Sequence, residues 1–461
     1  MNTKFLFLDN RLYEYVRGFR RGLNRPVQHA DNPIMEPELP HEFNRVLLYG
    51  SVVHDPEDGL FRMWYSSSAR EPKPVSHLLY AESDDGYAWR RPRLDVVPGT
   101  NIVMDDDRQI HGPTVILDRY EPDDAKRYKM IARRGRGVLA GYVSRDGIHW
   151  ELVREEPLIH ADSDSHIGLF RDPESGLYHA SFRDACPDRR VWRSESEDFL
   201  SWRRPVLALE PDIRDPIQTQ FYSMQMTPYG AYVLGWLHRY TTWEADLGPT
   251  KMNGNWDIEL AFSRGGYCWH RPAQGQDFLP RDPDGWTAGL ISPASSPLFF
   301  ADEIRFYFAG CEKEHGDDYS SKRFRIGVAS LRPDRFLSLD AGEKPAEIMT
   351  RAFATRSPAL FLNAAAAGGG AVRAELRDVA GAPIPGFELD RCVPLEADAT
   401  AARVRWRGNP SPAAFTEKPI RLYLTATRAS LYSATFADPA TIGDYRTFKE
   451  IRCLSPEHDL A

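Results

Sequence analysis

The chain has 461 residues, of which 42% are hydrophobic and 12% aromatic, and its formal net charge at pH 7 is −8. A globular composition at this length favours two domains, because a single core rarely grows so large. The negative charge and the lack of a polybasic run argue against nucleic acid and anionic membrane surfaces as partners. Five scattered cysteines indicate neither a disulfide framework nor a zinc site, and we expect no cofactor and no metal.

The N-terminal residues 1–41 are predicted to form an arm. They hold one short strand candidate, residues 5–8, followed by a polar segment punctuated by prolines. We interpret this segment as running across the next domain or into its closure. The first residues do not have the pattern of a secretory signal, and no later stretch is long and apolar enough to span a bilayer. We therefore expect a cytoplasmic protein.

Residues 42–340 repeat a unit of two β-hairpins in series. The second hairpin carries the motif Ser-x-Asp-Gly-x-x-Trp, complete or in altered form, at residues 83–89, 144–150, 196–202, 263–269 and 330–336. A first-hairpin turn precedes each copy, around Asp55, Asp118, Asp172, Gly230 and Asp302. Such turns between β-branched and aromatic runs are typical of hairpins, and a spacing of roughly 50–70 residues is that of propeller blades. Four-stranded units of this kind bury both faces by stacking around an axis, which predicts a five-bladed β-propeller.

Residues 341–461 differ in character and predict a C-terminal β-sandwich. Short strand candidates lie at 403–406, 420–425 and 430–436, with turn signals between them. The run AAAAGGG at 364–370 lies between two apolar stretches, so we interpret it as a long loop between strands. We expect this domain to pack against the propeller rather than to bind carbohydrate. The fold class predicted for the chain is all-β.

Propeller topology predicts which face carries a functional site. Both hairpin markers lie on one face, so their acids are interpreted as turn and capping residues, including Asp172 in an Arg-Asp-Pro motif. The opposite face receives the long polar loops and the first residues of the inner strands, where binding and catalytic groups commonly lie. These segments direct twelve candidates toward one funnel: Glu42, Arg45, His111, Asp164, His166, Arg183, Asp184, Tyr222, His238, Glu244, Glu312 and His315.

Each candidate also has a structural interpretation. Glu42 is a possible partner of Arg45, Asp164 a possible cap of the strand start, and Glu312 a solvated charge in a loop. The candidates taken together mix carboxylates with arginines, histidines and aromatic rings, a combination that suits a polyol ligand.

The hairpin motifs at Ser83, Ser144, Ser196 and Ser263, the five repeats and the trailing sandwich make the sequence similar to a known superfamily. It resembles the five-bladed propeller glycoside hydrolases of families 32, 43 and 68, which cleave fructans and arabinans. This resemblance implies acids at the starts of the inner strands of the first three blades. Carried over by position, these are Glu42 in the first blade and Asp164 in the third. The second blade offers His111, with Asp107 nearby, and the Trp-Met-Asn-Asp-Pro and Glu-Cys motifs of the fructan enzymes are missing.

The resulting functional hypothesis is a glycoside hydrolase that uses a carboxylate pair, one protonated and one ionised. Furanosides such as a fructoside or an arabinofuranoside are the favoured substrates. Glu42 is the expected nucleophile or base, and Asp164 or Glu312 the expected acid. The substrate would be bound by Arg45, His111, His166, Arg183, Asp184, Tyr222, His238 and His315.

Two other functions are open at this point. A non-catalytic carbohydrate-binding propeller would have a funnel of arginines and aromatic residues with a single acid. A sialidase-like hydrolase would need three arginines that hold a carboxylate, together with a Tyr–Glu pair; Arg45, Arg183 and Tyr222 supply parts of such a set. Carbohydrate is the expected partner in all three cases, and the sequence leaves the sugar and the oligomeric state open.

Overall fold

The computed structural model describes residues 2–104, 110–184, 188–243, 253–408, 411–412, 418–440, 442 and 448–450. Strands dominate these residues, and the helical elements are three single 3-10 turns, η1 (Pro40–Glu42), η2 (Asp124–Lys126) and η3 (Tyr319–Ser321). The predicted all-β class is confirmed. In this part of the chain no helix has the length and apolar character needed to cross a membrane.

The first three strand groups are separate antiparallel sheets in chain order. The first consists of β5 (Leu47–His54), β6 (Phe61–Ala69), β7 (Val75–Ser83) and β8 (Ile102–Met104). The second consists of β9 (Ile110–Leu117), β10 (Tyr128–Arg134), β11 (Val138–Ser144), β12 (Glu151–Leu152) and β13 (Ile159–His160). The third consists of β14 (Gly168–Arg171), β15 (Tyr178–Phe182), β16 (Val191–Ser196) and β17 (Val206–Leu209).

The fourth and fifth strand groups are joined into one sheet by a single parallel pair, Trp256 and Leu290. The fourth group is β18 (Thr219–Tyr229), β19 (Tyr232–Thr242), β20 (Gly254–Ser263) and β21 (Trp269–His270). The fifth is β22 (Leu290–Pro293), β23 (Leu298–Phe299), β24 (Ile304–Cys311) and β25 (Arg325–Leu331), completed by β4 (Val27–Gln28) from the N-terminal segment. Because two groups share this sheet, the count of five blades stays a prediction.

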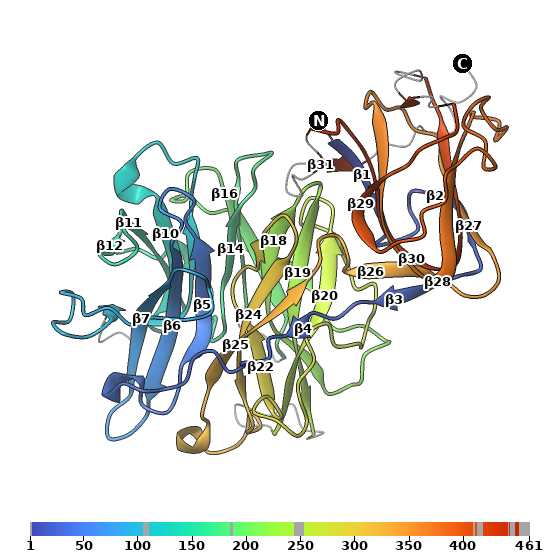
Figure 1. Ribbon diagram of the computed structural model, residues 1–461. Helices are drawn as coiled ribbons and strands as arrows, with labels where there is room; N and C mark the ends of the chain where they lie inside the picture. The colour runs from blue at the N-terminus through green and yellow to red at the C-terminus, as the bar shows by residue number, and fades with distance from the viewer. Residues whose placement is uncertain are drawn as a thin grey trace.

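The groups follow one another around a common centre, as in a β-propeller (Figure 1). Strands β5, β9, β14 and β18 pack in sequence, β22 follows through β19 and β20 of the fourth group, and β22 packs on β5 again. Side chains join neighbouring groups: Trp64 Nε1 donates to Gly147 O at 2.6 Å, and Tyr307 OH donates to Gly86 O at 3.0 Å. The second of these bonds links the fifth group to the first, so that distant parts of the chain meet around the axis.

The repeated Ser-x-Asp-Gly motif forms the tight turn that its composition predicts. In the first copy, the backbone N–H of Gly86 donates to Ser83 Oγ at 2.9 Å, and that of Tyr87 donates to Asp85 Oδ1 at 2.7 Å. Gly86 has a φ of +80°, which a residue with a Cβ rarely adopts. The copy that starts at Ser144 repeats these bonds. The aspartates of these two turns therefore hold backbone rather than substrate.

The Arg-Asp-Pro sequence at residues 171–173 also belongs to a turn. The Asp172 carboxylate accepts hydrogen bonds from the backbone N–H groups of Glu174 and Ser175, both at 3.2 Å. Arg171 donates instead to the buried carboxylate of Asp118, at 2.8 and 3.0 Å. The structural interpretation of Asp172 agrees with this geometry.

A nine-stranded sheet forms the second domain. It contains β26 (Leu337–Ala341), β27 (Ala346–Thr350), β28 (Ala359–Arg377), β29 (Ala399–Arg403), β30 (Arg421–Ala437) and β31 (Phe448–Glu450). Three strands from the start of the chain join them: β1 (Asn2–Leu6), β2 (Tyr13–Arg17) and β3 (Phe19–Leu23). In Figure 1 the blue strands β1 and β2 lie within the orange and red domain.

This arrangement corrects two expectations from the sequence. Residues 1–41 are not simply an arm, because residues 2–23 supply three strands to the second domain and only the part that follows crosses the propeller. The boundary at residue 340 also shifts, since β26 already pairs with β3 and β30. The N-terminal strands join the second domain because they bury apolar side chains there: Phe5, Phe7 and Leu12 lie in its core.

The AAAAGGG run is not a loop between two strands. It lies inside the long strand β28, which pairs with β30 up to Ala366 and again from Ala371. The register shifts between Ala366 and Ala371, so the extra small residues form an irregularity within the strand. Gly369, at a φ of +75°, lies in this irregular part.

Candidate active site in the propeller funnel

A cavity of about 710 Å³ opens at the centre of the propeller, and residues of all five strand groups line it. We call it the funnel cavity. Six of the residues expected from the sequence line it: Arg45, His111, Asp164, Arg183, Tyr222 and His315. The propeller therefore brings together residues that lie up to 270 positions apart in the sequence.

Asp164 presents its carboxylate to this cavity from the segment that precedes β14. Its side chain is 58% exposed, while the flanking Ser163 and Ser165 are buried and hold the backbone. Arg183 reinforces this position, since its Nη2 donates to the Asp164 backbone oxygen at 3.1 Å. The carboxylate does not cap the start of the strand, which was the alternative considered from the sequence. In the described structure its partners are side chains.

Three cationic or ionisable groups surround the Asp164 carboxylate. Arg133 Nη1 lies 3.2 Å and His111 Nε2 3.4 Å from Oδ1, and Arg183 Nη2 lies 3.8 Å from Oδ2. Partial burial acts to raise the pKa of Asp164, but His111, Arg183 and Arg133 outweigh it and lower that pKa. Burial in turn lowers the pKa of His111, which favours the neutral ring. Asp164 is therefore an ionised carboxylate at neutral pH.

Strand geometry explains why Arg133 and His111 meet at this point. They are register partners on β10 and β9, and the register of this pair of strands shifts between Ile131 and Arg133. Such a β-bulge changes the direction of a side chain beside it. The irregularity thus directs the Arg133 guanidinium toward the carboxylate of the next strand group.

Aromatic rings form the floor of the funnel cavity. Tyr49 on β5 stacks against Trp256 on β20, with ring centroids 6.2 Å apart and an interplanar angle of 16°. Tyr222 on β18 lies 4.6 Å from Trp256, and its hydroxyl is 3.3 Å from His315 Nε2. Burial raises the pKa of Tyr49 well above its usual value, so the phenol keeps its proton. The floor therefore borders the cavity with aromatic carbon atoms together with hydroxyl groups.

Two expected substrate-binding histidines lie beneath this floor. His166 and His238 are fully buried and are absent from the cavity wall. His166 stacks on Tyr49 at 5.4 Å, and burial lowers its pKa to about 3. Burial also lowers the pKa of His238 well below its usual value. Both rings are neutral and support the aromatic floor. They lie beneath the cavity rather than on its wall, contrary to the expectation that they contact the substrate.

Glu42 is not in the funnel cavity, contrary to its expected role as nucleophile or base. It is fully buried, and its Oε1 accepts hydrogen bonds from Tyr65 OH at 2.6 Å and Arg91 Nε at 2.7 Å. Its Oε2 accepts from the backbone N–H groups of Glu38 and Leu39 at 2.8 and 2.9 Å. Both oxygens are occupied, so this carboxylate holds the N-terminal segment against the first strand group.

Glu312 and Asp184 also lie outside the cavity wall. Glu312 pairs with Arg325 at 3.3 Å on the surface, as the structural interpretation of a solvated loop charge expects. Asp184 accepts a hydrogen bond from the backbone N–H of Asp162 at 3.2 Å. The candidates Asp107 and Glu244 lie outside the described residues.

The sequence reasoning missed several residues of the cavity wall. Three are cations inside polar loops or strand ends that were considered only as segments: Arg133, Arg189 and Lys322. Arg189 follows Arg183 by six positions in a loop containing three arginines, which was the available signal. The floor residues Tyr49 and Trp256 lie inside strands, where only the side of the strand they occupy distinguishes them from core residues.

Positive charge prevails on the described cavity wall, although the whole chain is negative. Six cations line it, Arg45, Arg70, Arg133, Arg183, Arg189 and Lys322, against three carboxylates, Glu71, Asp164 and Asp317. A concave site with walls of one charge focuses the electrostatic potential and favours ligands of the opposite sign. Among the described residues, no group of three or more His, Cys, Asp or Glu side chains is arranged to hold a metal ion.

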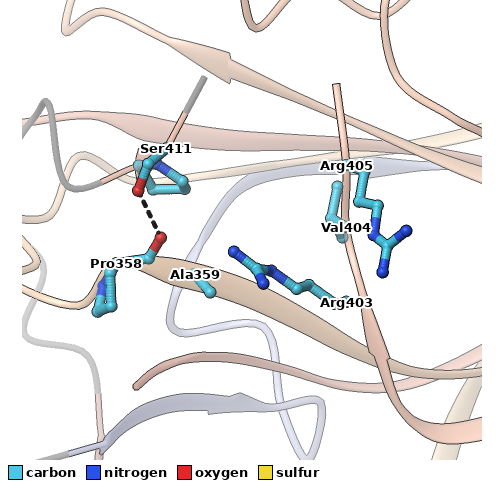
Figure 2. A pocket seen from close by; sticks show the side chains of 7 residues that line it. Pro358, Ala359, Arg403, Val404, Arg405 and Ser411 are labelled. Atoms are coloured by element: carbon cyan, nitrogen blue, oxygen red, sulfur yellow. Dashed lines mark hydrogen bonds between the residues drawn. The ribbon is translucent and has the colours of Figure 1, made fainter. Parts of the chain in front are cut away.

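A second cavity, of about 450 Å³, lies in the other domain (Figure 2). Its wall includes Arg403 and Arg405, and at its edge Ser411 Oγ donates to Pro358 O at 2.8 Å. The lining residues that the structure describes include no carboxylate and no histidine. This wall therefore offers no acid–base pair, and the funnel cavity is the stronger candidate.

No protein-family model matches the sequence, and the comparison with curated proteins gave no match. Similar solved structures include a glycosyl hydrolase from Bacteroides ovatus, 15% identical, covering 68% of this chain and 95% of that one with a TM-score of 0.46. A β-1,2-mannobiose phosphorylase from Listeria innocua is 13% identical, covering 66% and 96% with a TM-score of 0.46. An α-L-arabinofuranosidase catalytic domain from Coprinopsis cinerea is 15% identical, covering 68% and 97% with a TM-score of 0.44. We draw no functional conclusion from similarities at this level.

Proposed function

We propose that this protein acts on carbohydrate and cleaves a glycosidic bond in the funnel cavity, with Asp164 as the ionised catalytic carboxylate. The observation that carries the proposal is the setting of Asp164. It is the carboxylate that Arg133 and Arg183 hold in its charged form at the cavity wall, with His111 Nε2 3.4 Å from its Oδ1. An ionised carboxylate beside a sugar ring attacks the anomeric carbon, activates water or stabilises the oxocarbenium-like transition state.

The aromatic floor supports a sugar as the ligand. Tyr49, Tyr222 and Trp256, although largely buried, border the cavity with aromatic carbon atoms that suit the C–H groups of a sugar, while their polar atoms and the neighbouring arginines suit hydroxyl groups. A cavity of about 710 Å³ is in the range of small-molecule sites and accommodates a mono- or disaccharide.

Glycosidic cleavage also needs a group that donates a proton to the leaving oxygen. Among the described residues, Glu71 and Asp317 are the other carboxyl groups on the cavity wall, and we propose that one of them fills this role. A separation of about 5–5.5 Å between the two carboxyl groups would give retention of configuration, and about 6.5–9.5 Å inversion.

A panel of aryl glycosides, with fructosides and arabinofuranosides included, tests the proposal. Wild type should release the aryl group from at least one substrate, and Asp164→Asn should lose activity by about a hundredfold or more, as expected for a group that acts in the transition state. Glu312→Gln is the matched control, because it removes an exposed carboxylate outside the cavity. Equal activity of wild type and Asp164→Asn on every cleaved substrate would overturn the assignment.

A specific observation favours a second candidate function, a non-catalytic carbohydrate-binding propeller. Glu42 and Glu312, two of the three expected catalytic acids, lie outside the cavity, so Asp164 is the one expected acid on a wall rich in arginines and aromatic residues. Under this alternative a sugar binds with the same affinity at neutral and mildly acidic pH, and no member of the panel is cleaved.

A sialidase-like site would need further arginines and a Tyr–Glu pair. Arg133 and Arg189 on the cavity wall could supply the arginines, but the Tyr–Glu pair is not found among the described lining residues. The hydroxyl of Tyr222 lies 3.3 Å from His315 rather than beside a glutamate. We therefore place it behind the two functions above.

A further inference from the structure

Three cations on the wall of the funnel cavity lie within electrostatic reach of one another: Arg45, Arg70 and Lys322. Arg45 and Arg70 both lie over the ring of Tyr319, with guanidinium carbons 3.6 and 4.2 Å from its centroid. We call these three side chains the Arg45–Arg70–Lys322 cluster.

Two members of the cluster are buried, and the third, Arg70, is exposed. Arg45 is 4% and Lys322 8% exposed, which is unusual for cations unless they are paired. Within the described part of the chain no carboxylate forms an ion pair with any of the three. Their protein partners are neutral backbone oxygens: Arg45 Nη2 donates to Tyr319 O at 2.6 Å, and Lys322 Nζ donates to His315 O.

Buried like charges repel one another, so a fold rarely keeps them together unless something offsets the cost. Arg45 and Arg70 both act to lower the pKa of Lys322, while Asp317, also on the wall, acts to raise it without forming an ion pair with the lysine. By contrast Arg133 and Arg183, elsewhere on the same wall, are compensated by Asp164. Three cations against the one carboxylate of Asp317 therefore leave this part of the wall with net positive charge.

We infer that the Arg45–Arg70–Lys322 cluster binds an anionic group of the ligand, a carboxylate or a phosphate ester carried by a sugar. Guanidinium forks and ammonium groups are the usual protein ligands of such oxyanions. The assignment of the anion to a sugar rests on the proposed function, because the cluster shares its cavity with Asp164. It names the substrate class: an acidic or phosphorylated sugar rather than a neutral one.

Binding measured by calorimetry with the Asp164→Asn protein tests the inference without turnover. The probes are methyl glucuronide, glucose 6-phosphate, neutral methyl glucoside and inorganic phosphate. At least one anionic probe should bind about tenfold or more tightly than the neutral glucoside, since charge-assisted hydrogen bonds favour ionised groups. Preference for methyl glucuronide identifies a carboxylate, preference for glucose 6-phosphate a phosphate ester, and equal binding of inorganic phosphate a free anion that occupies the same cluster.

Two variants tie the affinity to the cluster. Lys322→Gln and Arg70→Gln should each weaken the preferred anion about tenfold while leaving the neutral glucoside within twofold. Arg70 is exposed at the rim, so its variant folds even if replacement of the buried lysine does not. Lys313→Gln, an exposed lysine of the neighbouring loop outside the cavity wall, is the control and should bind like the parent protein.

Equal affinity for anionic and neutral probes, or an anion preference that survives both cluster variants, would overturn the inference. Its failure is distinguishable from failure of the proposed function. Cleavage of a neutral glycoside with no anion preference removes this inference alone. Anion binding that depends on the cluster, with no glycoside cleaved, removes the catalytic proposal alone.

Discussion

Arg133 Nη1 and Asp164 Oδ1 lie 3.2 Å apart, although the two residues come from neighbouring strand groups of the propeller. The Asp164 side chain is more than half exposed, so an ion pair of this kind contributes little to stability. Its consequence is electrostatic, since Arg133 is one of the groups that lower the pKa of the carboxylate. The pair therefore links the shape of β10 to the charge state of the site.

Replacement of Arg133 by glutamine should move the acidic limb of the pH profile to higher pH. Asp164 has a lowered pKa, so it keeps its charge to a lower pH than an ordinary aspartate. Removing one cation raises that pKa, and Asp164 is then protonated earlier as the pH falls. The measurement is kcat/KM on a cleaved glycoside as a function of pH.

Arg136→Gln is the matched control for this prediction. Arg136 is 88% exposed and pairs with Asp162 at 3.5 Å rather than with Asp164. Its replacement should leave the acidic limb where it is in wild type. An equal displacement in both variants, or a displacement to lower pH in Arg133→Gln, contradicts the role of Arg133.

Glu42→Gln should destabilise the fold rather than abolish chemistry. The substitution leaves Arg91 beside a neutral group and disturbs four hydrogen bonds to a fully buried carboxylate. Breaking a buried charged pair costs about 3–5 kcal/mol. Chemical denaturation should show the loss, while kcat of the folded fraction should stay within a few-fold of wild type. Glu38→Gln, which removes an exposed partner of Arg91, should cost far less.

The pH dependence of stability gives a second readout for Glu42. Burial acts to raise its pKa, but the N–H groups of Glu38 and Leu39, with Tyr65 and Arg91, outweigh burial and lower it. A carboxylate with a lowered pKa stabilises the fold above its ordinary pKa, and this stabilisation is lost as the pH falls through the folded-state pKa. Wild type should therefore lose stability in this acidic window more steeply than Glu42→Gln. Parallel curves would show that Glu42 is not ionised in the native protein.

Asp118→Asn and Asp172→Asn are a matched pair of variants. The first removes hydrogen bonds between two strand groups, and the second removes hydrogen bonds within a single turn. Asp118 is buried and accepts two hydrogen bonds from Arg171 of the third group, and Tyr178 OH also donates to it. Its replacement should lower the free energy of unfolding by about 3 kcal/mol or more. Asp172 is at the surface and holds only its own turn, so its replacement should cost about 1 kcal/mol or less. Denaturant unfolding of both variants measures the two losses. Equal losses of stability would show that the hydrogen bonds of Asp118 between the strand groups contribute no more than those of a local turn.

The repeats made much of the propeller predictable from the sequence. A turn such as Ser83 to Gly86 depends on local hydrogen bonds and a positive φ, so its residues determine it wherever it occurs. The second domain was less accessible, because β1 to β3 pair with strands more than 300 positions away. Short apolar strands near a terminus do not indicate which sheet they join.

The site was predictable only as a region. Topology correctly brought His111, Asp164 and Tyr222 to one cavity, since the starts of inner strands meet near a propeller axis. It failed for Glu42 because burial of a side chain depends on its neighbours: here a 3-10 turn directs the carboxylate toward Arg91. The prediction also failed for Glu312, which is at the surface. Its loop contributes His315 to the cavity wall, but Glu312 points to Arg325 outside the cavity.

Anion binding at the cluster should weaken as the pH rises through about 8. Burial, Arg45 and Arg70 lower the pKa of Lys322 to about 8, so the lysine is protonated at neutral pH and loses its charge above that value. The affinity for a carboxylate probe such as methyl glucuronide should fall across this range, as the probe itself does not titrate there. Lys322→Arg should remove the decline, because a guanidinium stays charged. A decline that persists in Lys322→Arg would assign the titration to another group.

Lys4→Met should destabilise the contact between the two domains. Lys4 is 3% and Asp334 2% exposed, and Lys4 Nζ donates to both oxygens of Asp334 at 2.9 Å. Without the lysine, Asp334 keeps its bonds from Tyr229 and Ser433 but no buried cation. The loss should be about 3–5 kcal/mol, measured by denaturant unfolding. Lys449→Met, which removes a half-exposed lysine of the same domain, should change stability by less than about 1 kcal/mol.

A double variant distinguishes loss of charge balance from loss of packing at this contact. Asp334 has a φ of +66°, a conformation that asparagine tolerates as well as aspartate does. Lys4→Met with Asp334→Asn should therefore recover part of the stability that Lys4→Met loses, because no uncompensated charge remains buried. If the double variant is no more stable than Lys4→Met, packing of the methylene stem of the lysine carries the contact instead of its charge.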